Sequence, residues 1–224
     1  MDGERFDTFA RALGRRIGRR GALGSMAVGA ALLGGAAASA RGRGHGGAAG
    51  ITPQGVEKFT AKAGVYDPDK TGCPVAKWQK KVGLPDQKGK KRQGLVLQKN
   101  CPVSTNAAAG AEIVGAQGIT LTQLGFDVKG YCNSGSPRFN VYTKSDYSEY
   151  YFVGCSYGLP GIDMGSDFTR LRFTEPDFVP VNPAMPPFKF GSTQVFYMEI
   201  VADEEGQSVI DNIAINSWVI DKKK

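Results

Sequence analysis

The sequence contains very little histidine, and this shortage excludes several kinds of catalytic and metal site. Its one histidine, His45, lies in the glycine-rich run 41–47, whose composition is typical of a flexible segment. A Ser-His-Asp or Cys-His catalytic site requires a histidine that the fold holds in place, and a histidine-rich metal site requires several. We therefore expect neither kind of site in this protein.

Other common signatures are also missing. The sequence has no P-loop, no dinucleotide-binding fingerprint and no Cys-x-x-Cys pair. Carboxylate-dependent glycoside hydrolysis stays open, because that reaction needs only a pair of acidic side chains. The available carboxylates lie in no distinctive motif: Asp127, Glu149, Asp163, Asp167, Glu175, Asp177, Glu199 and Asp203. An enzyme is thus an alternative to the leading prediction. We expect no cofactor, and a structural calcium ion, discussed below, stays open.

Cysteine is scarce too, with four residues in the whole chain. They are Cys73, Cys101, Cys132 and Cys155, and their wide spacing argues against a metal site. In an exported chain four cysteines indicate two disulfides, with three connectivities open. Because shorter loops close more readily, we predict Cys73–Cys101 and Cys132–Cys155. Each bridge would stabilise the fold by about 3 kcal/mol.

The formal net charge of +7 is distributed unevenly along the chain. Residues 94–224 carry ten Lys and Arg against fourteen Asp and Glu, whereas residues 41–93 carry twelve against four. The basic residues are thus concentrated before the part that we expect to fold. A protein that reads nucleic acid would carry its basic surface on the fold, so we predict no nucleic-acid partner.

Residues 1–40 have the organisation of an export signal. A charged start is followed by an uncharged run rich in Ala, Gly and Leu, and Ala38-Ser39-Ala40 then offers small residues to a signal peptidase. We expect the mature chain to begin at Arg41, to be secreted or extracytoplasmic, and to have no stable membrane insertion after cleavage.

The pair Arg19-Arg20 before this weakly apolar run resembles a twin-arginine signal. That resemblance implies export of an already folded bacterial protein. The sequence departs from the usual pattern at Gly18 and Ala22, so a Sec signal or an uncleaved anchor remains an alternative.

Residues 41–93 read as a basic and mostly flexible linker. Lysine and arginine recur through this stretch with little sustained apolar period. The functional interpretation is an electrostatic tether to an acidic cell wall or membrane surface, and the alternative is a solvated spacer.

Residues 94–224 contain strand-like runs separated by turn residues and no convincing helical period. About eight strands without intervening helices predict an all-β fold, a two-sheet antiparallel β-sandwich that is jelly-roll-like. The expected strands cover 94–99, 111–115, 119–128 with a bulge between Leu121 and Leu124, 138–143, 149–154, 168–174, 193–203 and 209–220.

The hairpin between Cys132 and Cys155 supplies the candidate ligand-binding residues. If Phe139 and Val141 face the core, alternation turns Arg138, Asn140 and Tyr142 to the other side of the strand. Glu149 and Tyr151 of the second strand are expected to join them, while a one-residue slip would turn Tyr150 and Phe152 outward instead. Tyrosine stacks on sugar rings and the polar side chains bind hydroxyls, so this face predicts a carbohydrate site; an ordinary solvated face is the alternative.

Two further segments are candidates for a functional or structural role. Residues 175–191 contain five prolines and several large apolar side chains, which suits either the rim of a binding site or a cover over a sheet edge. Asp203, Glu205 and Asp211 flank the last turn and are candidate ligands for calcium, although a solvated acidic hairpin explains them equally well.

Three stretches carry a resemblance to a known class of protein: 118–127, 132–140 and Val209-Ile-Asp-Asn-Ile213. They resemble uncharacterised exported bacterial β-sandwich proteins, and the last stretch is similar to jelly-roll carbohydrate-binding modules. The resemblance implies a non-catalytic carbohydrate-binding or adhesion module whose partner is a polysaccharide or cell-wall surface. A structural cell-envelope protein without a small ligand, and a carboxylate-dependent glycosidase, are the alternatives.

Overall fold

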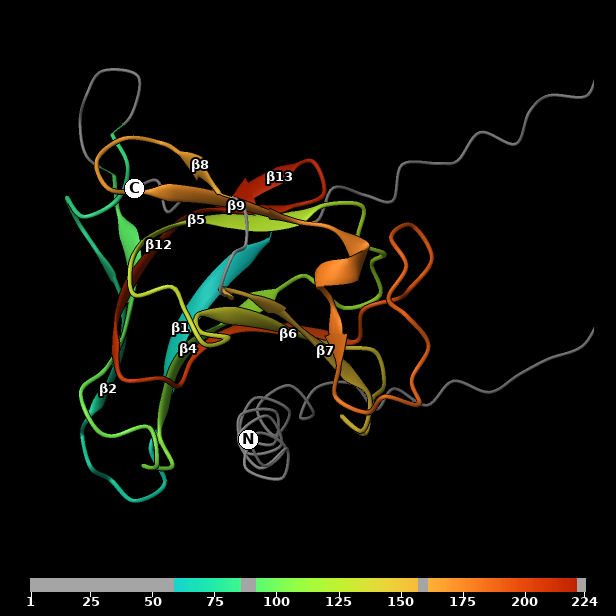
Figure 1. Cartoon of the computed structure of the whole chain (residues 1–224), viewed down its shortest axis with the longest axis horizontal. Helices are drawn as coiled ribbons and strands as arrows, with labels where there is room; N and C mark the ends of the chain where they lie inside the picture. The colour runs from blue at the N-terminus through green and yellow to red at the C-terminus, as the bar shows by residue number, and fades with distance from the viewer. Residues whose placement is uncertain (1–58, 86–91, 157–160, 221–224) are drawn as a thin grey trace, which may run out of the picture.

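The computed structural model describes residues 59–85, 92–156 and 161–220, which form two antiparallel sheets packed face to face (Figure 1). The predicted signal residues, Arg19, Arg20, Ala38 and Ala40 among them, lie outside the described residues. Within the described ranges the one helical turn is the 3-10 turn η1 (Glu175–Asp177). The predicted all-β class is confirmed.

Each sheet is built from strands that come from distant parts of the chain. The six-stranded sheet has the order β1 (Thr60–Tyr66), β4 (Ala108–Val114), β11 (Tyr197–Ala202), β6 (Arg138–Tyr142), β7 (Tyr150–Gly154) and β10 (Val179–Pro180). The seven-stranded sheet has the order β2 (Pro74–Gln79), β3 (Gly94–Lys99), β12 (Gly206–Ile215), β5 (Leu124–Gly130), β9 (Thr169–Phe173) and β8 (Ile162–Asp163), and β13 (Trp218–Ile220) pairs with β12.

The central strands pair in the manner of a long hairpin that has been rolled up. Among them β3 pairs with β12, β4 with β11, β5 with β9, and β6 with β7, so the pairing runs from the outermost strands inward. Their spatial orders, β3-β12-β5-β9 and β4-β11-β6-β7, are those of a jelly roll. The predicted jelly-roll sandwich is therefore confirmed by the strand pairing itself.

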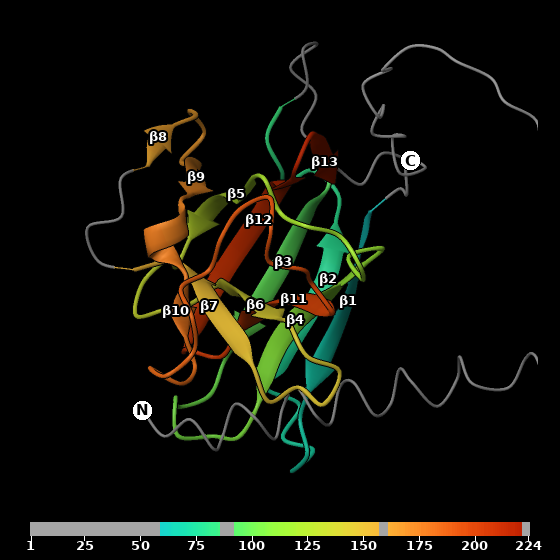
Figure 2. The ribbon, with the colours of Figure 1, turned by 90° about the vertical axis from the view of Figure 1, so that its right-hand side faces the viewer.

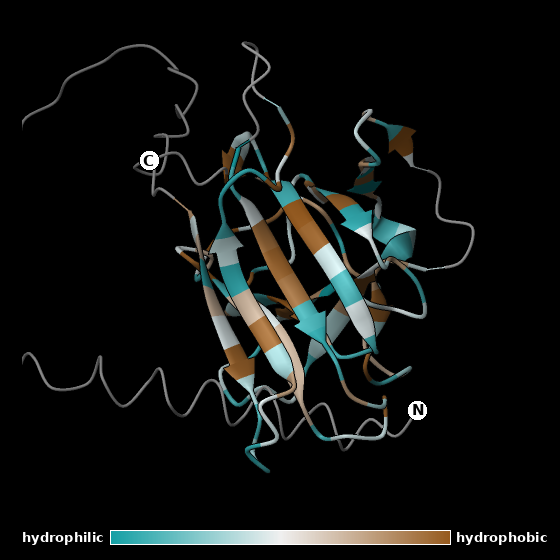
Figure 3. Cartoon of the chain, turned by 90° about the vertical axis from the view of Figure 1, so that its left-hand side faces the viewer, coloured by the Kyte–Doolittle hydropathy of each residue, from teal (hydrophilic) through white to brown (hydrophobic). Residues whose placement is uncertain are grey.

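Aromatic side chains join the two sheets in the core. Phe126 of β5 lies 5.6 Å from Phe139 of β6 and 5.5 Å from Phe173 of β9, measured between ring centroids. All three rings are buried, and their tilted and edge-to-face arrangement is the favoured one. Figure 3 shows hydrophobic residues concentrated along the strands, whereas many connecting loops are hydrophilic.

The proline-rich segment closes one end of the sandwich. Phe178 and Phe188 stack with their centroids 4.0 Å apart, and Met185 is buried with them in the main core. The hydroxyl of Tyr151 donates to the carbonyl oxygen of Pro186 at 2.7 Å, which ties the segment to β7. Residues 178–188 thus cover this part of the core, while Pro176, Asp177 and Val179 of the same segment line the cavity described below.

The boundary predicted at residue 94 is wrong. β1 and β2 lie within the predicted linker 41–93, yet they form one edge of each sheet and pair with β4 and β3. The indole N–H of Trp78 on β2 donates to the carbonyl oxygen of Ala61 on β1 at 2.9 Å, which joins the two edges. Residues 41–58 and 86–91 of that linker lie outside the described residues.

Both predicted disulfides are present. Cys73 bonds to Cys101 and Cys132 bonds to Cys155, so all four cysteines are paired. The second bridge lies at the open end of the β6–β7 hairpin, where the Cys155 N–H donates to the Pro137 carbonyl at 3.0 Å.

The predicted bulge lies elsewhere than expected. β5 begins only at Leu124, and the irregularity is in its partner β12, between Asp211 and Ala214. Asn212 within it has a φ of 45°. Asparagine tolerates this left-handed conformation better than most residues, which accounts for its place in the Asp-Asn-Ile sequence.

In the part of the chain that the structure describes, no helix has the length and apolar character needed to cross a bilayer.

Candidate ligand-binding face

The outer surface of the six-stranded sheet carries an unusual mixture of rings and polar groups. Its strands follow one another as β1, β4, β11, β6, β7 and β10, and Figure 2 shows them across the molecule. Residues opposite each other in an antiparallel pair share a face, so the register defines rows across the sheet. We call this surface the tyrosine face, formed by Lys62, Glu112, Arg138, Asn140, Tyr142, Tyr150, Phe152, Tyr197 and Glu199.

One row of the tyrosine face is aromatic. Tyr197 lies opposite Tyr142, and Tyr142 lies opposite Tyr150. The rings of Tyr142 and Tyr150 stack with centroids 4.7 Å apart, and Tyr197 is 5.6 Å from Tyr142. Tyr147, at the tip of the loop between β6 and β7, packs edge-on against Tyr142 at 5.4 Å.

This packing leaves the rings differently exposed. Tyr142 and Tyr150 are buried, whereas Tyr147 and Tyr197 are half-buried. Burial raises the pKa of Tyr142 and Tyr197 well above the usual tyrosine value, so both hydroxyls keep their protons at physiological pH. The accessible rings of the row are therefore Tyr147 and Tyr197.

The next row is polar and centred on Glu199. This residue lies between Glu112 on β4 and Asn140 on β6. Its Oε1 accepts from the Asn140 amide at 3.1 Å and from the Tyr142 hydroxyl at 3.4 Å, and its Oε2 accepts from the Tyr197 hydroxyl at 3.3 Å. Burial raises the pKa of Glu199 to about 7, although these donors act in the opposite direction. The carboxyl group therefore titrates near neutral pH.

The third row contains Arg138, whose charge is neutralised within the face. Its two terminal nitrogens donate to the two carboxylate oxygens of Asp203 at 2.8 and 2.9 Å, a bidentate geometry. Its Nε donates to Asn140 at 3.1 Å, and its guanidinium carbon lies 5.1 Å from the centroid of the Phe152 ring. Arg138 thus links β6, the end of β11 and the Phe152 ring of β7.

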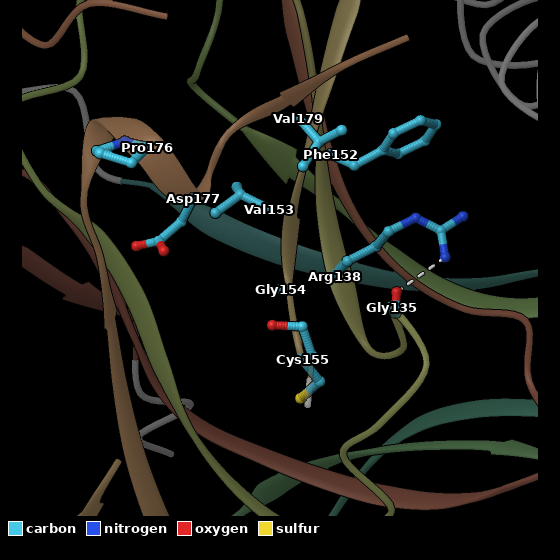
Figure 4. A pocket seen from close by; sticks show the side chains of 10 residues that line it. Gly135, Arg138, Phe152, Val153, Gly154, Cys155, Pro176, Asp177 and Val179 are labelled. Carbon is cyan, nitrogen blue, oxygen red and sulfur yellow. Dashed lines mark hydrogen bonds between the residues drawn. The ribbon is translucent and has the colours of Figure 1, made fainter. Parts of the chain in front are cut away.

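A cavity of about 270 Å³ opens beside this row (Figure 4). Figure 4 shows Arg138 and Phe152 extending to one side of the hairpin, and Val153 and Asp177 lying on the other. β10 pairs with β7 only at Tyr151 and Phe152. The residues that follow, Gly154 and Ser156, line the cavity at that edge of β7. The cavity thus combines an aromatic ring with charged and hydroxyl side chains.

The predicted site residues divide into two groups. Arg138, Asn140 and Tyr142 share one face, as predicted, but all three are buried. Tyr151 does not join them: it lies opposite Val141, faces the core, and its predicted outward direction is wrong. Glu149 lies in the loop before β7 and pairs with Lys144.

Several residues of the tyrosine face are not among the site residues predicted from the sequence. Tyr150 and Phe152 take the outward places on β7, the outcome expected for a one-residue slip. Tyr197 and Glu199 come from β11, which lies far along the chain, and the sequence carries no signal that β11 neighbours β6. The alternation of Tyr197, Glu199 and Val201 with buried Met198 and Ile200 was the available clue.

The three calcium candidates do not form a group. Asp203 binds Arg138, and Asp211 accepts the Leu84 and Asn212 N–H groups at 2.7 and 2.8 Å. Glu205 is exposed. Among the described residues no three His, Cys, Asp or Glu side chains are placed to hold a metal ion. These three candidates therefore do not form a calcium site with one another.

The comparisons with known proteins identify similar structures and no family. No protein-family model and no curated protein sequence matches the chain. One similar structure is the family 11 carbohydrate-binding module of cellulosomal cellulase Lic26A-Cel5E of Clostridium thermocellum, with 15% identity, a TM-score of 0.40, and 73% of this chain and 89% of that chain covered. Another is the family 11 module from Clostridium thermocellum in complex with a β-1,3-1,4-mixed-linked tetrasaccharide, with 15% identity, a TM-score of 0.40, and coverage of 73% and 91%.

Proposed function

We propose that this protein is an exported, non-catalytic β-sandwich that binds carbohydrate on the tyrosine face, as a carbohydrate-binding or adhesion module. The observation that carries the proposal is the composition of that face: the half-buried rings of Tyr147, Phe152 and Tyr197 share it with the half-buried carboxyl group of Glu112 and the exposed ammonium group of Lys62. Rings stack on the apolar faces of sugars, and fixed polar groups select hydroxyls. The partner is accordingly a polysaccharide or a cell-wall surface.

Export is part of this proposal. Two disulfides among the four cysteines fit an oxidising compartment. The signal itself is tested by N-terminal sequencing of secreted protein, which should begin at Arg41; a chain beginning at Met1 would indicate an anchor. Replacement of Arg19 and Arg20 by Lys should block export, and unchanged export would indicate a Sec signal.

The binding test begins with a glycan array on the chain from Arg41 to Lys224. For a glycan that binds, Tyr147→Ala and Phe152→Ala should each weaken affinity by about 1 kcal/mol, the typical value of one ring contact. Tyr131→Ala is the matched control, because Tyr131 is also a half-buried tyrosine but follows β5 in the other sheet. Equal losses in all three variants would contradict a site on the tyrosine face.

The competing function is a structural cell-envelope protein without a small ligand. The burial of Tyr142 and Tyr150 favours it, since rings that pack against each other serve the fold. Absence of binding to every polysaccharide tested would support this alternative. Turnover of a polysaccharide that is lost in Glu112→Gln would instead indicate a glycosidase.

A further inference from the structure

Two carboxylates face each other at the centre of the tyrosine face. Glu199 on β11 lies directly opposite Glu112 on β4, and both strands are interior strands of the sheet. Glu199 is 1% exposed, and Glu112 is half-buried. Like charges directly across a strand pair repel each other, and burial strengthens the repulsion. This arrangement disfavours two ionised carboxylates at once.

The charges around Glu199 do not compensate for its burial. Among the described residues no Lys or Arg forms a salt bridge with Glu199. The charge of Arg138 on β6 lowers the pKa of Glu199, but its bidentate pair is with Asp203, and burial still raises that pKa. Burial raises the pKa of the Glu112 carboxyl group above its usual value, and Lys62, which lies opposite Glu112 on β1, acts in the other direction.

The remaining titratable groups that face Glu199 are tyrosines. They are Tyr142 on β6, Tyr197 on β11 and Tyr147 in the β6–β7 loop. Together with the Asn140 amide, the Tyr142 and Tyr197 hydroxyls are neutral donors to the carboxylate. Neutral donors stabilise an ionised carboxyl group less than a paired cation does.

We propose that the proton of the Glu199 carboxyl group sets the direction of the Tyr197 hydroxyl and so regulates ligand binding at the tyrosine face. The ligand part rests on the carbohydrate-binding function proposed above. When Glu199 is ionised, the Tyr197 hydroxyl donates to Oε2. When Oε2 carries the proton, it donates to the Tyr197 oxygen, and the hydroxyl hydrogen of Tyr197 turns away from Glu199.

Tyr197 transmits this change to the surface because it is half-buried while Glu199 is not accessible. The released hydrogen then donates to an oxygen of a bound sugar. One such hydrogen bond changes affinity by about twofold to tenfold. Affinity should therefore be higher at pH 6 than at pH 8, in agreement with the raised pKa of Glu199.

The first measurement needs no ligand. In the complete chain, ¹³C-detected NMR follows the carboxyl carbon of Glu199 and the ring carbon that bears the Tyr197 hydroxyl as the pH changes. Both signals should shift with one midpoint near 7, and the Tyr197 shift should vanish in Glu199→Gln. A Glu199 midpoint in the ordinary range near pH 4.3 overturns the proposal. A Tyr197 signal that does not shift together with the Glu199 signal also overturns it.

Two variants test the carboxylate pair. Glu112→Gln removes the opposing charge and should move the Glu199 midpoint to lower pH. Glu149→Gln is the matched control, because Glu149 lies in the loop before β7 and pairs with Lys144, and it should leave the midpoint unchanged. An unchanged midpoint in Glu112→Gln would contradict the proposed coupling of the two carboxylates.

The second measurement uses a glycan selected on the array. Its affinity should fall about twofold to tenfold from pH 6 to pH 8 in the natural protein, and remain constant in Glu199→Gln. Equal affinity at both pH values overturns the regulation. If no glycan binds, the carbohydrate-binding function fails, and the two NMR signals still decide whether the proton and the hydroxyl are coupled.

Discussion

Arg138 is a single side chain on which the stability of the tyrosine face depends. Replacement by Met keeps much of its apolar stem but leaves the buried carboxylate of Asp203 without its bidentate partner. We expect Arg138→Met to lower the free energy of unfolding by about 3 to 5 kcal/mol, the usual cost of breaking a buried pair. Urea denaturation measures this loss, and the double variant with Asp203→Asn should recover most of it. A single variant as stable as the natural protein would contradict the buried pair.

The pH dependence of stability tests a second single side chain, that of Glu199. Burial raises the pKa of Glu199 from 4.5 to about 7, so the folded state retains a proton that the unfolded state releases. The stability contributed by this proton is complete below pH 4.5 and is lost as the pH rises through 7, a loss of about 3 kcal/mol.

Urea denaturation of the natural protein and of Glu199→Gln across this pH range isolates the contribution. The variant should lose about 3 kcal/mol less than the natural protein between pH 4.5 and 7.5. Glu149→Gln should lose as much as the natural protein does. Parallel pH curves for the natural protein and Glu199→Gln would contradict the buried position of this group.

The sequence predicted some residues of the tyrosine face and not others. Alternation alone places Arg138, Asn140 and Tyr142 together, because the period of a strand is fixed. The direction of Tyr151 depends on the pairing partner as well, and Val141 lies opposite it. Glu199 belongs to a strand whose neighbours are set by the whole topology, so no local pattern brings it to Asn140.

Among the elements, the β6–β7 hairpin depends on close backbone contact at Gly154. A Cβ atom at this position would lie 2.3 Å from the Cα of Arg138, closer than packing allows. We expect Gly154→Ala to destabilise the fold by about 1 to 3 kcal/mol, as overpacking does. Thermal unfolding followed by circular dichroism measures the effect.

Gly64 offers the matched control for this substitution. It lies in β1 of the same sheet, and a Cβ atom there would meet no heavy atom within 4 Å. Gly64→Ala should therefore leave the melting temperature nearly unchanged. A similar loss in both variants would indicate that general strand effects, and not the contact with Arg138, cause it.

The elements at the sheet edges were the hardest to predict. β1 and β2 are rich in small and polar residues, and each carries an exposed lysine, Lys62 or Lys77. Charged residues on edge strands prevent pairing with other chains. The same charged residues resemble the composition of a linker, and for this reason the sequence predicted a linker where β1 and β2 lie. The interior strand β3 was predicted over the range that it occupies, because most of its residues are buried and apolar.

For the molecule as a whole, we expect the two disulfides to contribute independently to the free energy of unfolding. Each closes a loop of similar length, with sequence separations of 28 and 23 residues. Replacing either pair by serine should lower the free energy of unfolding by about 3 kcal/mol, and replacing both pairs should lower it by about twice as much. Urea denaturation of the three variants checks this, and a much larger loss for both pairs together would indicate that the bridges act as one unit.

The pairing of β3 with β12 also has a consequence for the order of events during synthesis. The seven-stranded sheet needs β12, which begins at Gly206, whereas every cysteine has been added once Cys155 is reached. Each cysteine bonds to its neighbour along the chain, so correct oxidation needs no contact between the two ends of the fold. Under the proposed export, a chain that crosses the membrane unfolded can thus complete both bridges before its sandwich closes. A chain that folds first would instead cross with its four thiols already placed next to their partners.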